Sequence, residues 1–448
     1  MSGRHAALAQ QTQALAQTLA LIDVHLFEAT YLDEYFCALF VEVAPSSPLN
    51  AARARVVRAG DVRARRQRMK RLLNLATIAL LAATVSGCGH FTALPVRGEV
   101  AGQTVDTMVD SEAARYYLAH YLRGERREPA YDAAFDALHA EPSEALPTRA
   151  RLKALSERYS PDLAALFFVQ RLETHAPNRP LRTAFEREFA RLRASAQRPD
   201  PRFAGYLVLF VPGWDYTYSS VITGADFALP RQRLAEAGLD NRLVEIPPHG
   251  AVEDNAAVIA REIEQRRGGE KKLIVVSTSS AGPAVALALG ERLPAAATLH
   301  VRAWLNVGGI LQGTPVADRH LGFPLSLLAR PYAWIMGWPW EAVESMSTAR
   351  SRERFARLRL PAHLLTINYF GVPLSGQVTP LAIDNYLAMR PDGPNDGLTL
   401  IADALVPDSP SLAALGRDHF LAEDPEIGLR TLALAHMLMA SLEGPADR

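Results

Sequence analysis

Cysteine is scarce in this sequence, with two among 448 residues. No group of cysteines and histidines has the spacing of metal ligands, and no glycine-rich loop is followed by a lysine, as a phosphate-binding loop would be. Net charge is also lacking, because 48 basic residues balance 48 acidic ones. A chain without net positive charge has no general attraction for nucleic acid. We therefore expect no metal, no cofactor and no nucleic-acid partner.

The most distinctive segment is residues 272–283, with the sequence KLIVVSTSSAGP. Its apolar start is typical of a buried parallel strand, and its final proline is typical of the first turn of a helix. The turn between them consists of small residues. Ser279 has Ser277 two positions before it, and Ala281 and Gly282 two and three positions after it. A nucleophile on a tight, strained turn requires such neighbours, because larger side chains would collide with it.

This strand, turn and helix resemble the nucleophile elbow of the α/β-hydrolase superfamily, with a serine and an alanine where glycines are usual. The resemblance implies that Ser279 is a catalytic nucleophile. It also implies an oxyanion hole formed by two backbone N–H groups. One belongs to Ser280, and the other belongs to Trp214, which follows the apolar strand and Pro-Gly turn of residues 206–213.

Two later segments supply further partners in the chain order Ser, Asp, His expected of this superfamily. Residues 393–398, GPNDGL, form a tight polar loop that resembles the loop carrying the triad acid in bacterial lipases, which implies Asp396. Residues 417–420, RDHF, precede the last helical segment, where the catalytic histidine of the superfamily falls, which implies His419. His436 lies inside an apolar helical run, where a structural role is expected. The nearby acids that could replace Asp396 beside the imidazole are Asp392, Asp403 and Asp418.

These residues predict a serine ester hydrolase, similar to a lipase or esterase, that cleaves an ester or lipid substrate through an acyl-enzyme. His419 would accept the proton of Ser279, and Asp396 would orient the imidazole and stabilise its cation. Two alternatives remain. The same triad serves thioesterases, acyltransferases and amidases, because a fold does not select the substrate. A hydrolase-like protein without activity could instead bind envelope lipids or a protein partner.

Residues 69–88 resemble a bacterial lipoprotein signal peptide. Basic residues after Met69 precede an apolar stretch of residues 72–85, and the run ends in Val-Ser-Gly-Cys. The resemblance implies that residues 69–87 are removed and that Cys88 is lipidated, for example with palmitate. It implies a protein anchored by lipid to the bacterial cell envelope, at the periplasmic face of the outer membrane. Residues 1–68 are then expected to be an upstream over-extension of the chain.

The rest of the chain divides into segments of different periodicity. Residues 88–105 are expected to form an extended tether, and residues 106–200 a helical N-terminal subdomain, because apolar residues recur there at helical spacing. From 205 to 445, apolar strands alternate with helices at roughly thirty residues per strand, which is typical of parallel βαβ units. We expect an α/β-hydrolase fold, with a mostly parallel sheet and helices on both faces.

An insertion is expected between two strands at residues 311–355. In α/β hydrolases an insertion at this place commonly forms a cap or lid over the site. It carries three of the five tryptophans, namely Trp334, Trp338 and Trp340. Large amphipathic rings favour contact with apolar substrate or a membrane surface, which makes these residues candidates for the substrate pocket. Packing in a small hydrophobic core under the cap is the alternative.

The lipoprotein interpretation makes a direct prediction. A chain that starts at Met69 should be exported, processed and recovered with membranes, and Cys88→Ala should abolish the membrane recovery because the acceptor sulfur is lost. Cell fractionation and mass spectrometry of the mature N-terminus measure both effects. An unmodified native chain that begins at Met1 would contradict the prediction.

Overall fold

The computed structural model describes residues 93–141, 145–194, 200–421 and 424–443. These residues belong to one compact unit that spans Phe91–Arg448. The predicted over-extension, the predicted signal peptide and Cys88 lie outside the described residues.

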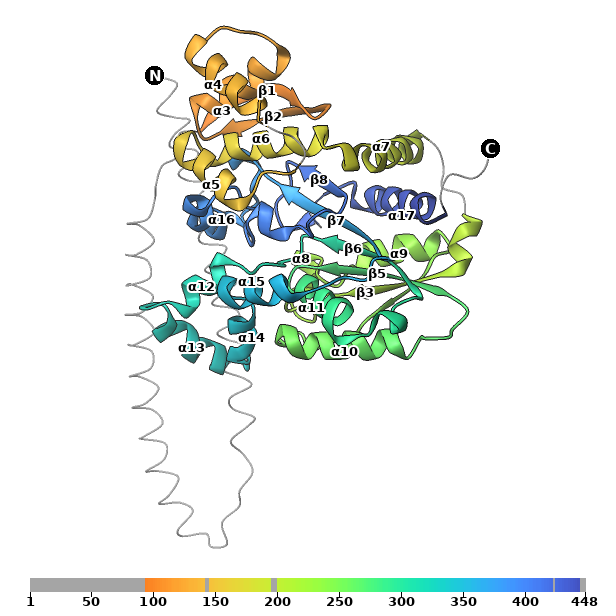
Figure 1. Ribbon diagram of the computed structural model, residues 1–448. Coiled ribbons are helices and arrows are strands. Elements are labelled where there is room, and N and C mark those ends of the chain that lie inside the picture. Colours follow the sequence, from red (N-terminus) through yellow and green to blue (C-terminus); the bar gives the residue numbers. More distant parts are fainter. Residues whose placement is uncertain (1–92, 142–144, 195–199, 422–423, 444–448) are drawn as a thin grey trace, which may run out of the picture. The chain divides into compact units, whose positions relative to one another are not determined.

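A six-stranded parallel sheet forms the centre of this unit (Figure 1). Its strands follow the order β4-β3-β5-β6-β7-β8, and every neighbouring pair is parallel. The arrangement confirms the expected fold class. The bounds are β3 (Tyr206–Val211), β4 (Asp240–Leu243), β5 (Lys272–Thr278), β6 (Val301–Val307), β7 (Leu365–Val372) and β8 (Ser411–Leu415).

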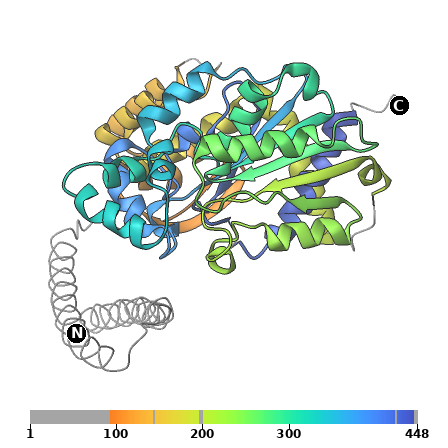
Figure 2. The same ribbon diagram turned by 90° about the horizontal axis from the view of Figure 1, so that it is seen from below.

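Helices cover both faces of the sheet (Figures 1 and 2). On one face α10 (Val252–Glu264) and α11 (Ala281–Leu287) pack against residues such as Leu209 and Val275. On the other face α9 (Ala228–Glu236) and α17 (Ile427–Glu443) pack against the alternate residues, such as Phe210 and Val276. The helix α7 (Arg179–Ala194) lies along α17. Both faces of β3, β5, β6 and β7 are therefore buried, which accounts for their continuous apolar runs in the sequence. The edge strand β4, with the sequence DNRL, is polar and partly exposed.

The segment between β6 and β7 is helical, as an inserted cap would be. It comprises α12 (Pro315–Leu321), α13 (Ser326–Ile335), α14 (Trp340–Ser345) and α15 (Thr348–Arg357), and its first three helices lie together to one side of the sheet in Figure 1. Two further short helices follow other strands. They are α8 (Ser220–Thr223), after β3, and α16 (Ile383–Met389), between β7 and β8.

The structure differs from the expected tether at residues 88–105. The described part of this segment enters an antiparallel hairpin of β1 (Leu94–Val100) and β2 (Gln103–Val109). Valines at spacing four, among them Val96 and Val105, are buried against the helices that follow. Gly98 lies midway between Val96 and Val100, and a Cβ added to it would lie 2.3 Å from the carbonyl oxygen of Leu118 in α3 (Glu112–Ala119). Close packing of the hairpin against α3 therefore explains why this segment is ordered as strands and is not a tether.

The helical region after the hairpin shares its core with the sheet. Its helices are α3 (Glu112–Ala119), α4 (Pro129–His139), α5 (Arg149–Arg158) and α6 (Pro161–Thr174). Phe168 of α6 stands edge-on to Phe370 of β7, with ring centroids 6.2 Å apart, and Val372 joins the same cluster. The region thus extends the core of the sheet at the β7–β8 side.

Two buried carboxylates join this extension to the loop after β7. Asp162 Oδ2 accepts a hydrogen bond from the backbone N–H of Asp110 (2.8 Å), and its Oδ1 accepts from both the N–H and the hydroxyl of Ser375 (3.0 Å each). Arg390 donates to Asp110 Oδ2 (2.9 Å). Arg390 also donates to the hydroxyl of Ser375 (2.9 Å). Burial and the nearby charge of Asp110 raise the pKa of Asp162 to about 7.

We predict that Asp162→Asn changes the pH dependence of stability. Asp162 binds its proton more tightly in the folded chain than in the unfolded chain, so its contribution to stability is full at low pH and is lost as pH rises to about 7. The stability of the variant relative to wild type should therefore rise from pH 5 to about 7 by on the order of 1 kcal/mol per pH unit, and then level off. Urea unfolding at several pH values measures this. Asp106→Asn, at an exposed position of β2, is the matched control, and a difference that stays constant with pH would contradict the prediction.

Candidate active site

Ser279 lies at the carboxyl end of β5 in a strained turn. Its φ of 54° is in the left-handed region, which is uncommon for residues other than glycine. Hydrogen bonds to the neighbouring strand and loop hold this backbone: Ser279 N–H donates to the Val307 carbonyl (3.2 Å), and Ile310 N–H donates to the Ser279 carbonyl (3.0 Å). Ser279 lines a cavity, whereas Ser280 is buried and does not line it. The structure thus gives Ser279, and not its neighbour, access to a substrate.

The small residues around Ser279 are required by close packing. Ser277 is fully buried, and its hydroxyl accepts a hydrogen bond from Trp304 Nε1 (2.9 Å). A Cβ added to Gly282 would lie 2.7 Å from Gly309 Cα, so α11 and the loop after β6 could not approach each other with a larger side chain there. The serine and alanine at the positions usually held by glycine are compatible with this turn.

Asp396 and His419 are joined by a hydrogen bond of 2.8 Å between Asp396 Oδ2 and His419 Nδ1. Asp396 lies in the loop before β8, and its Oδ1 accepts from the N–H groups of Leu398 (2.9 Å) and Thr399 (2.7 Å). His419 follows β8 and donates its own backbone N–H to the Asp396 carbonyl (2.8 Å). Backbone groups therefore fix the carboxylate, and the carboxylate fixes the imidazole.

The other acids that could have replaced Asp396 have different partners. Asp392 pairs with a lysine of α5, Asp403 pairs with two arginines, and the Asp418 carboxylate accepts hydrogen bonds from backbone N–H groups. His436 lies on α17 and bonds to Asp200 through Nδ1 (3.0 Å). Among these candidates, Asp396 is the acid bonded to the imidazole of His419.

The free nitrogen of His419 and the hydroxyl of Ser279 belong to one cavity. Both residues line it, and the His419 side chain is only 4% exposed. Within the described residues, His419 Nε2 is buried and has no hydrogen-bond partner, so it forms no hydrogen bond with Ser279 Oγ in this structure. Contacts of this kind are often loose without substrate and tighten when substrate binds. An unpaired buried nitrogen is costly in a protein interior, which marks Nε2 as a site for a ligand or a proton.

The two expected oxyanion donors flank Ser279. The loop after β3 approaches it so closely that a Cβ added to Gly213 would lie 3.2 Å from Ser279 Cβ. Trp214 follows this glycine, and Ser280 follows the nucleophile in the chain. In the part of the chain that the structure describes, neither the Trp214 N–H nor the Ser280 N–H donates to a protein acceptor. Both donors are therefore available to an oxygen bound beside Ser279.

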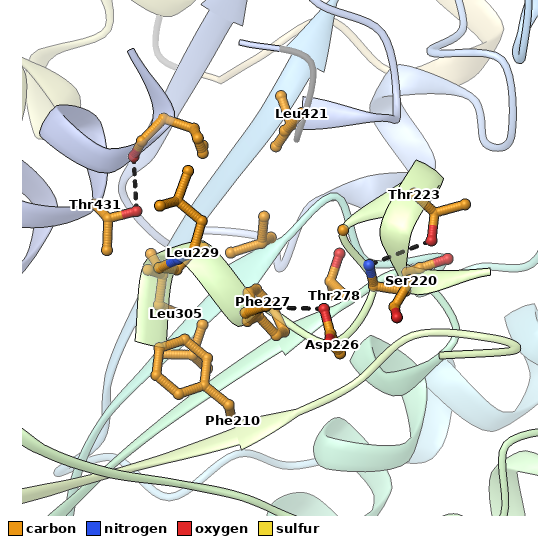
Figure 3. A pocket seen from close by; sticks show the side chains of 18 of the residues that line it. Phe210, Ser220, Thr223, Asp226, Phe227, Leu229, Thr278, Leu305, Leu421 and Thr431 are labelled. Carbon is orange, nitrogen blue, oxygen red and sulfur yellow. Dashed lines mark hydrogen bonds between the residues drawn. The ribbon is translucent and has the colours of Figure 1, made fainter. Parts of the chain in front are cut away.

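The cavity has a volume of about 560 Å³ and extends from Ser279 into the fold. Figure 3 shows Ser220 and Thr223 of α8 on one side, and Leu229 of α9 near Phe210 and Leu305 of the sheet on the other. Ser220 and Thr223 therefore lie at one end of the cavity, and the side chains labelled at the other end are apolar except for Thr431.

The three tryptophans of the cap lie in different surroundings. Trp338 lines the cavity and stands edge-on to Trp214, with ring centroids 5.7 Å apart. Trp334 is 82% exposed on α13, and Trp340 lies under the guanidinium of Arg330. The structure therefore brings Trp338 to the candidate site, whereas Trp334 and Trp340 are not among the residues that line it.

One pair at the mouth of the cavity was not expected from the sequence. His249 Nε2 bonds to Asp215 Oδ1 (2.8 Å), and the Asp215 N–H donates to the Pro248 carbonyl (3.0 Å). The His249 ring also packs against both Trp214 and Trp338, at centroid distances of 5.0 and 5.1 Å. These contacts fix the loop that carries the Trp214 N–H. No local pattern could have paired Asp215 with a histidine 34 residues away.

Opposing effects act on the pKa of the His419 imidazole. Burial lowers the pKa of its imidazole, but the charge of Asp396 and its hydrogen bond to Nδ1, together with the charge of Asp418, raise the pKa above its ordinary value of 6.5. The imidazole is therefore a better proton acceptor than an isolated histidine.

No group of three or more His, Cys, Asp or Glu side chains is arranged to hold a metal ion among the described residues. No helix within the described ranges is long and apolar enough to cross a membrane.

Comparisons with known proteins give distant structural similarities. No protein-family model matches the sequence, and the search of curated proteins finds no match. The chain is similar to the metagenomic carboxyl esterase MGS0156, with 23% identity and a TM-score of 0.43 over 54% of this chain and 76% of that chain. It is similar to the mature Bacillus licheniformis lipase BlEst2, with 22% identity and a TM-score of 0.43 over 53% of this chain and 94% of that chain. A third similarity is to the RedJ thioesterase of Streptomyces coelicolor, with 18% identity and a TM-score of 0.30 over 54% and 93% of the two chains.

We predict that the titration of His419 depends on Asp396. With ¹³C-labelled histidine, the NMR signal that disappears in His419→Gln should titrate with a pKa above 6.5. Asp396→Asn removes the main charge that favours the imidazolium, so the titration should move to lower pH. An unchanged midpoint in Asp396→Asn would contradict the assignment of this pair.

Proposed function

We propose that this protein is a serine hydrolase that cleaves carboxylic esters through an acyl-enzyme. One observation carries the proposal: a hydrogen-bonded Asp396–His419 pair presents an unpaired Nε2 in the cavity that also holds the strained Ser279. Nucleophile, base and orienting acid are thus three side chains from three loops at the carboxyl ends of parallel strands, where ligands bind in open α/β sheets.

The reaction proceeds in two steps, acylation of Ser279 and hydrolysis of the acyl-enzyme. Ser279 Oγ attacks the ester carbonyl carbon while His419 Nε2 takes the hydroxyl proton, which gives a tetrahedral intermediate. The C–O bond to the alcohol breaks, and the alcohol leaves with the proton held on Nε2. Water then attacks the acyl carbon while Nε2 takes a proton from the water, and that proton passes to Ser279 Oγ as the carboxylic acid leaves. Asp396 stabilises the imidazolium through Nδ1 in both steps.

Backbone N–H groups stabilise the charge that develops on the carbonyl oxygen. The unpaired N–H groups of Trp214 and Ser280 flank Ser279, and each such donor contributes about 10²–10³ in kcat in comparable sites. The loop of Trp214 is fixed by the Asp215–His249 pair, so its donor needs little reorganisation during the reaction.

The strain at Ser279 supports a functional role for this turn. A serine held at positive φ costs on the order of 1–3 kcal/mol, and strain of this kind clusters at active sites and ligand clamps.

We predict that Ser279→Ala abolishes hydrolysis of p-nitrophenyl butyrate and covalent labelling by a fluorophosphonate, with its thermal unfolding unchanged. Alanine keeps the turn small but removes the attacking oxygen, and loss of a triad member lowers kcat by about 10⁴-fold or more. Ser280→Ala is the matched control, because it changes the adjacent hydroxyl and keeps the backbone N–H.

Mass spectrometry of the labelled peptide identifies the modified serine. Label on Ser280, with activity retained in Ser279→Ala, would shift the nucleophile by one position. A folded wild-type chain that neither takes the label nor cleaves the ester would contradict the proposal and favour the non-catalytic alternative.

We also propose that the enzyme acts at the bacterial cell envelope, anchored through a lipid on Cys88. The sequence of residues 69–88 carries this proposal. Apolar side chains on and beside α13 are exposed, including Phe323 (84% exposed) and Trp334 (82% exposed). Exposed apolar side chains of this kind can contact lipid, which supports the proposal of a membrane location.

A further inference from the structure

The cavity does not end at the nucleophile but continues between the sheet and two helices. Its apolar part lies between the face of β3, β5 and β6 on one side and α9 and α17 on the other, in the layer where a hydrophobic core is expected (Figure 3). Protein interiors contain few voids larger than a water molecule. A cavity of about 560 Å³ that enters this layer therefore points to a ligand, and its volume is within the range of small-molecule sites.

The parallel register divides the sheet side of this inner cavity into three levels. Residues that alternate along a strand share a face, so each level is two residues deeper than the one before. Thr278, Val307 and Tyr369 form the first level, Phe210, Val276 and Leu305 form the second, and Val208 and Ile274 form the third. The second and third levels are wholly apolar. On the helix side, the hydroxyl of Thr431 donates a hydrogen bond to the Ile427 carbonyl (2.8 Å), so it does not require a polar partner on a ligand.

From this geometry we propose that the inner cavity is an acyl-chain site that selects unbranched chains of about ten to twelve carbons. The proposal rests on the ester hydrolysis proposed above and names the substrate class of that site. The apolar walls exclude a polar chain, because a buried polar group without a partner is destabilising.

The expected length of the acyl chain follows from the depth of the third level below the first. The distance from Thr278 to Ile274 is four residues, or about 13 Å at about 3.3 Å per residue. An extended hydrocarbon with C–C bonds of about 1.5 Å and angles near 111° advances about 1.3 Å per carbon, so about ten carbons reach the third level.

The shape of the site follows from the strands that line each level. Three strands contribute to the second level, but only β3 and β5 contribute to the third, where the floor is about one strand spacing of 4.8 Å wide. The narrowing admits one unbranched chain and excludes fused rings.

The chain in the cavity is the acyl part of the ester and not the alcohol part. The opposite end of the cavity carries the polar groups of Asp215, Ser219 and Thr223, together with Trp338. A leaving alcohol must take its proton from His419 and depart toward solvent, which this polar end permits. The acyl group stays attached to Ser279 Oγ until water attacks, and the apolar cavity holds it in place meanwhile.

Chain-length kinetics test the proposal. For p-nitrophenyl esters used below their aggregation concentration, kcat/KM should rise from C4 to C10–C12 and fall at C16. Methyl dodecanoate should be cleaved faster than dodecyl acetate, which contains the long chain on the alcohol side. A preference for dodecyl acetate, or a rate that does not depend on chain length, would overturn the proposal.

Variants of α17 test the location of the chain. Ala435 lines the cavity, and Ala435→Phe should lower the ratio of kcat/KM for C12 over C4 by about tenfold or more, because the ring occupies space that only a long chain uses. Leu438→Ala should move the optimum to a longer chain. Ala440→Phe, on the same helix but outside the cavity, is the matched control and should leave the ratio unchanged. Equal ratios in wild type and in both cavity variants would overturn the location.

A binding measurement separates this proposal from the proposed catalysis. Ser279→Ala should bind dodecanoate with at least about tenfold higher affinity than butyrate in calorimetry, and Ala435→Phe in the same background should remove that difference. If wild type cleaves no ester but this binding pattern is found, the acyl-chain site stands and the proposed function fails. If dodecanoate binds no better than butyrate, the acyl-chain site is wrong whatever the activity.

Discussion

The left-handed backbone at Ser279 is the constraint on which the rest of the site depends. A serine adopts that conformation only when its surroundings hold it there, and here the ends of β5 and β6 do so through hydrogen bonds to Val307 and from Ile310. The same contacts require Gly282 and Gly309 to pack without side chains. Because the turn is fixed by the sheet, the hydroxyl stands at the edge where the loops of Trp214, Asp396 and His419 also end.

The N-terminal extension supports the far side of this arrangement. Phe168 of α6 and the hairpin valines share a core with Phe370 and Val372 of β7, next to the strand that leads to His419. The pair of Asp110 and Asp162 ties this extension to the loop after β7. A change in packing there would reach His419 through β8, so the extension contributes to the geometry of the site without touching a substrate.

Much of the fold could be predicted from the sequence because apolar strands and helices have clear periods. Small residues around Ser279 and the Pro-Asn-Asp-Gly loop predicted Ser279, which lines the cavity with His419, and Asp396, which is hydrogen-bonded to His419. The hairpin before α3 was missed because its valines are four apart with Gly98 between them, which does not resemble simple alternation. The strand β8, with the sequence SLAAL, is too short and too rich in alanine to resemble a strand. The Asp215–His249 pair and the inner cavity could not be predicted, because both arise from segments that are distant in the sequence and adjacent only in the fold.

A crystal structure of the protein after reaction with a fluorophosphonate that carries a dodecyl chain tests the account most directly. We predict a bond from Ser279 Oγ to phosphorus, the phosphoryl oxygen at the N–H groups of Trp214 and Ser280, and His419 Nε2 within hydrogen-bond distance of the adduct. The dodecyl chain should lie between the sheet and α9 and α17, with its end near Val208 and Ile274. Phosphorus on another residue would contradict the proposed nucleophile, and a chain that lies over α13 would contradict the acyl-chain site.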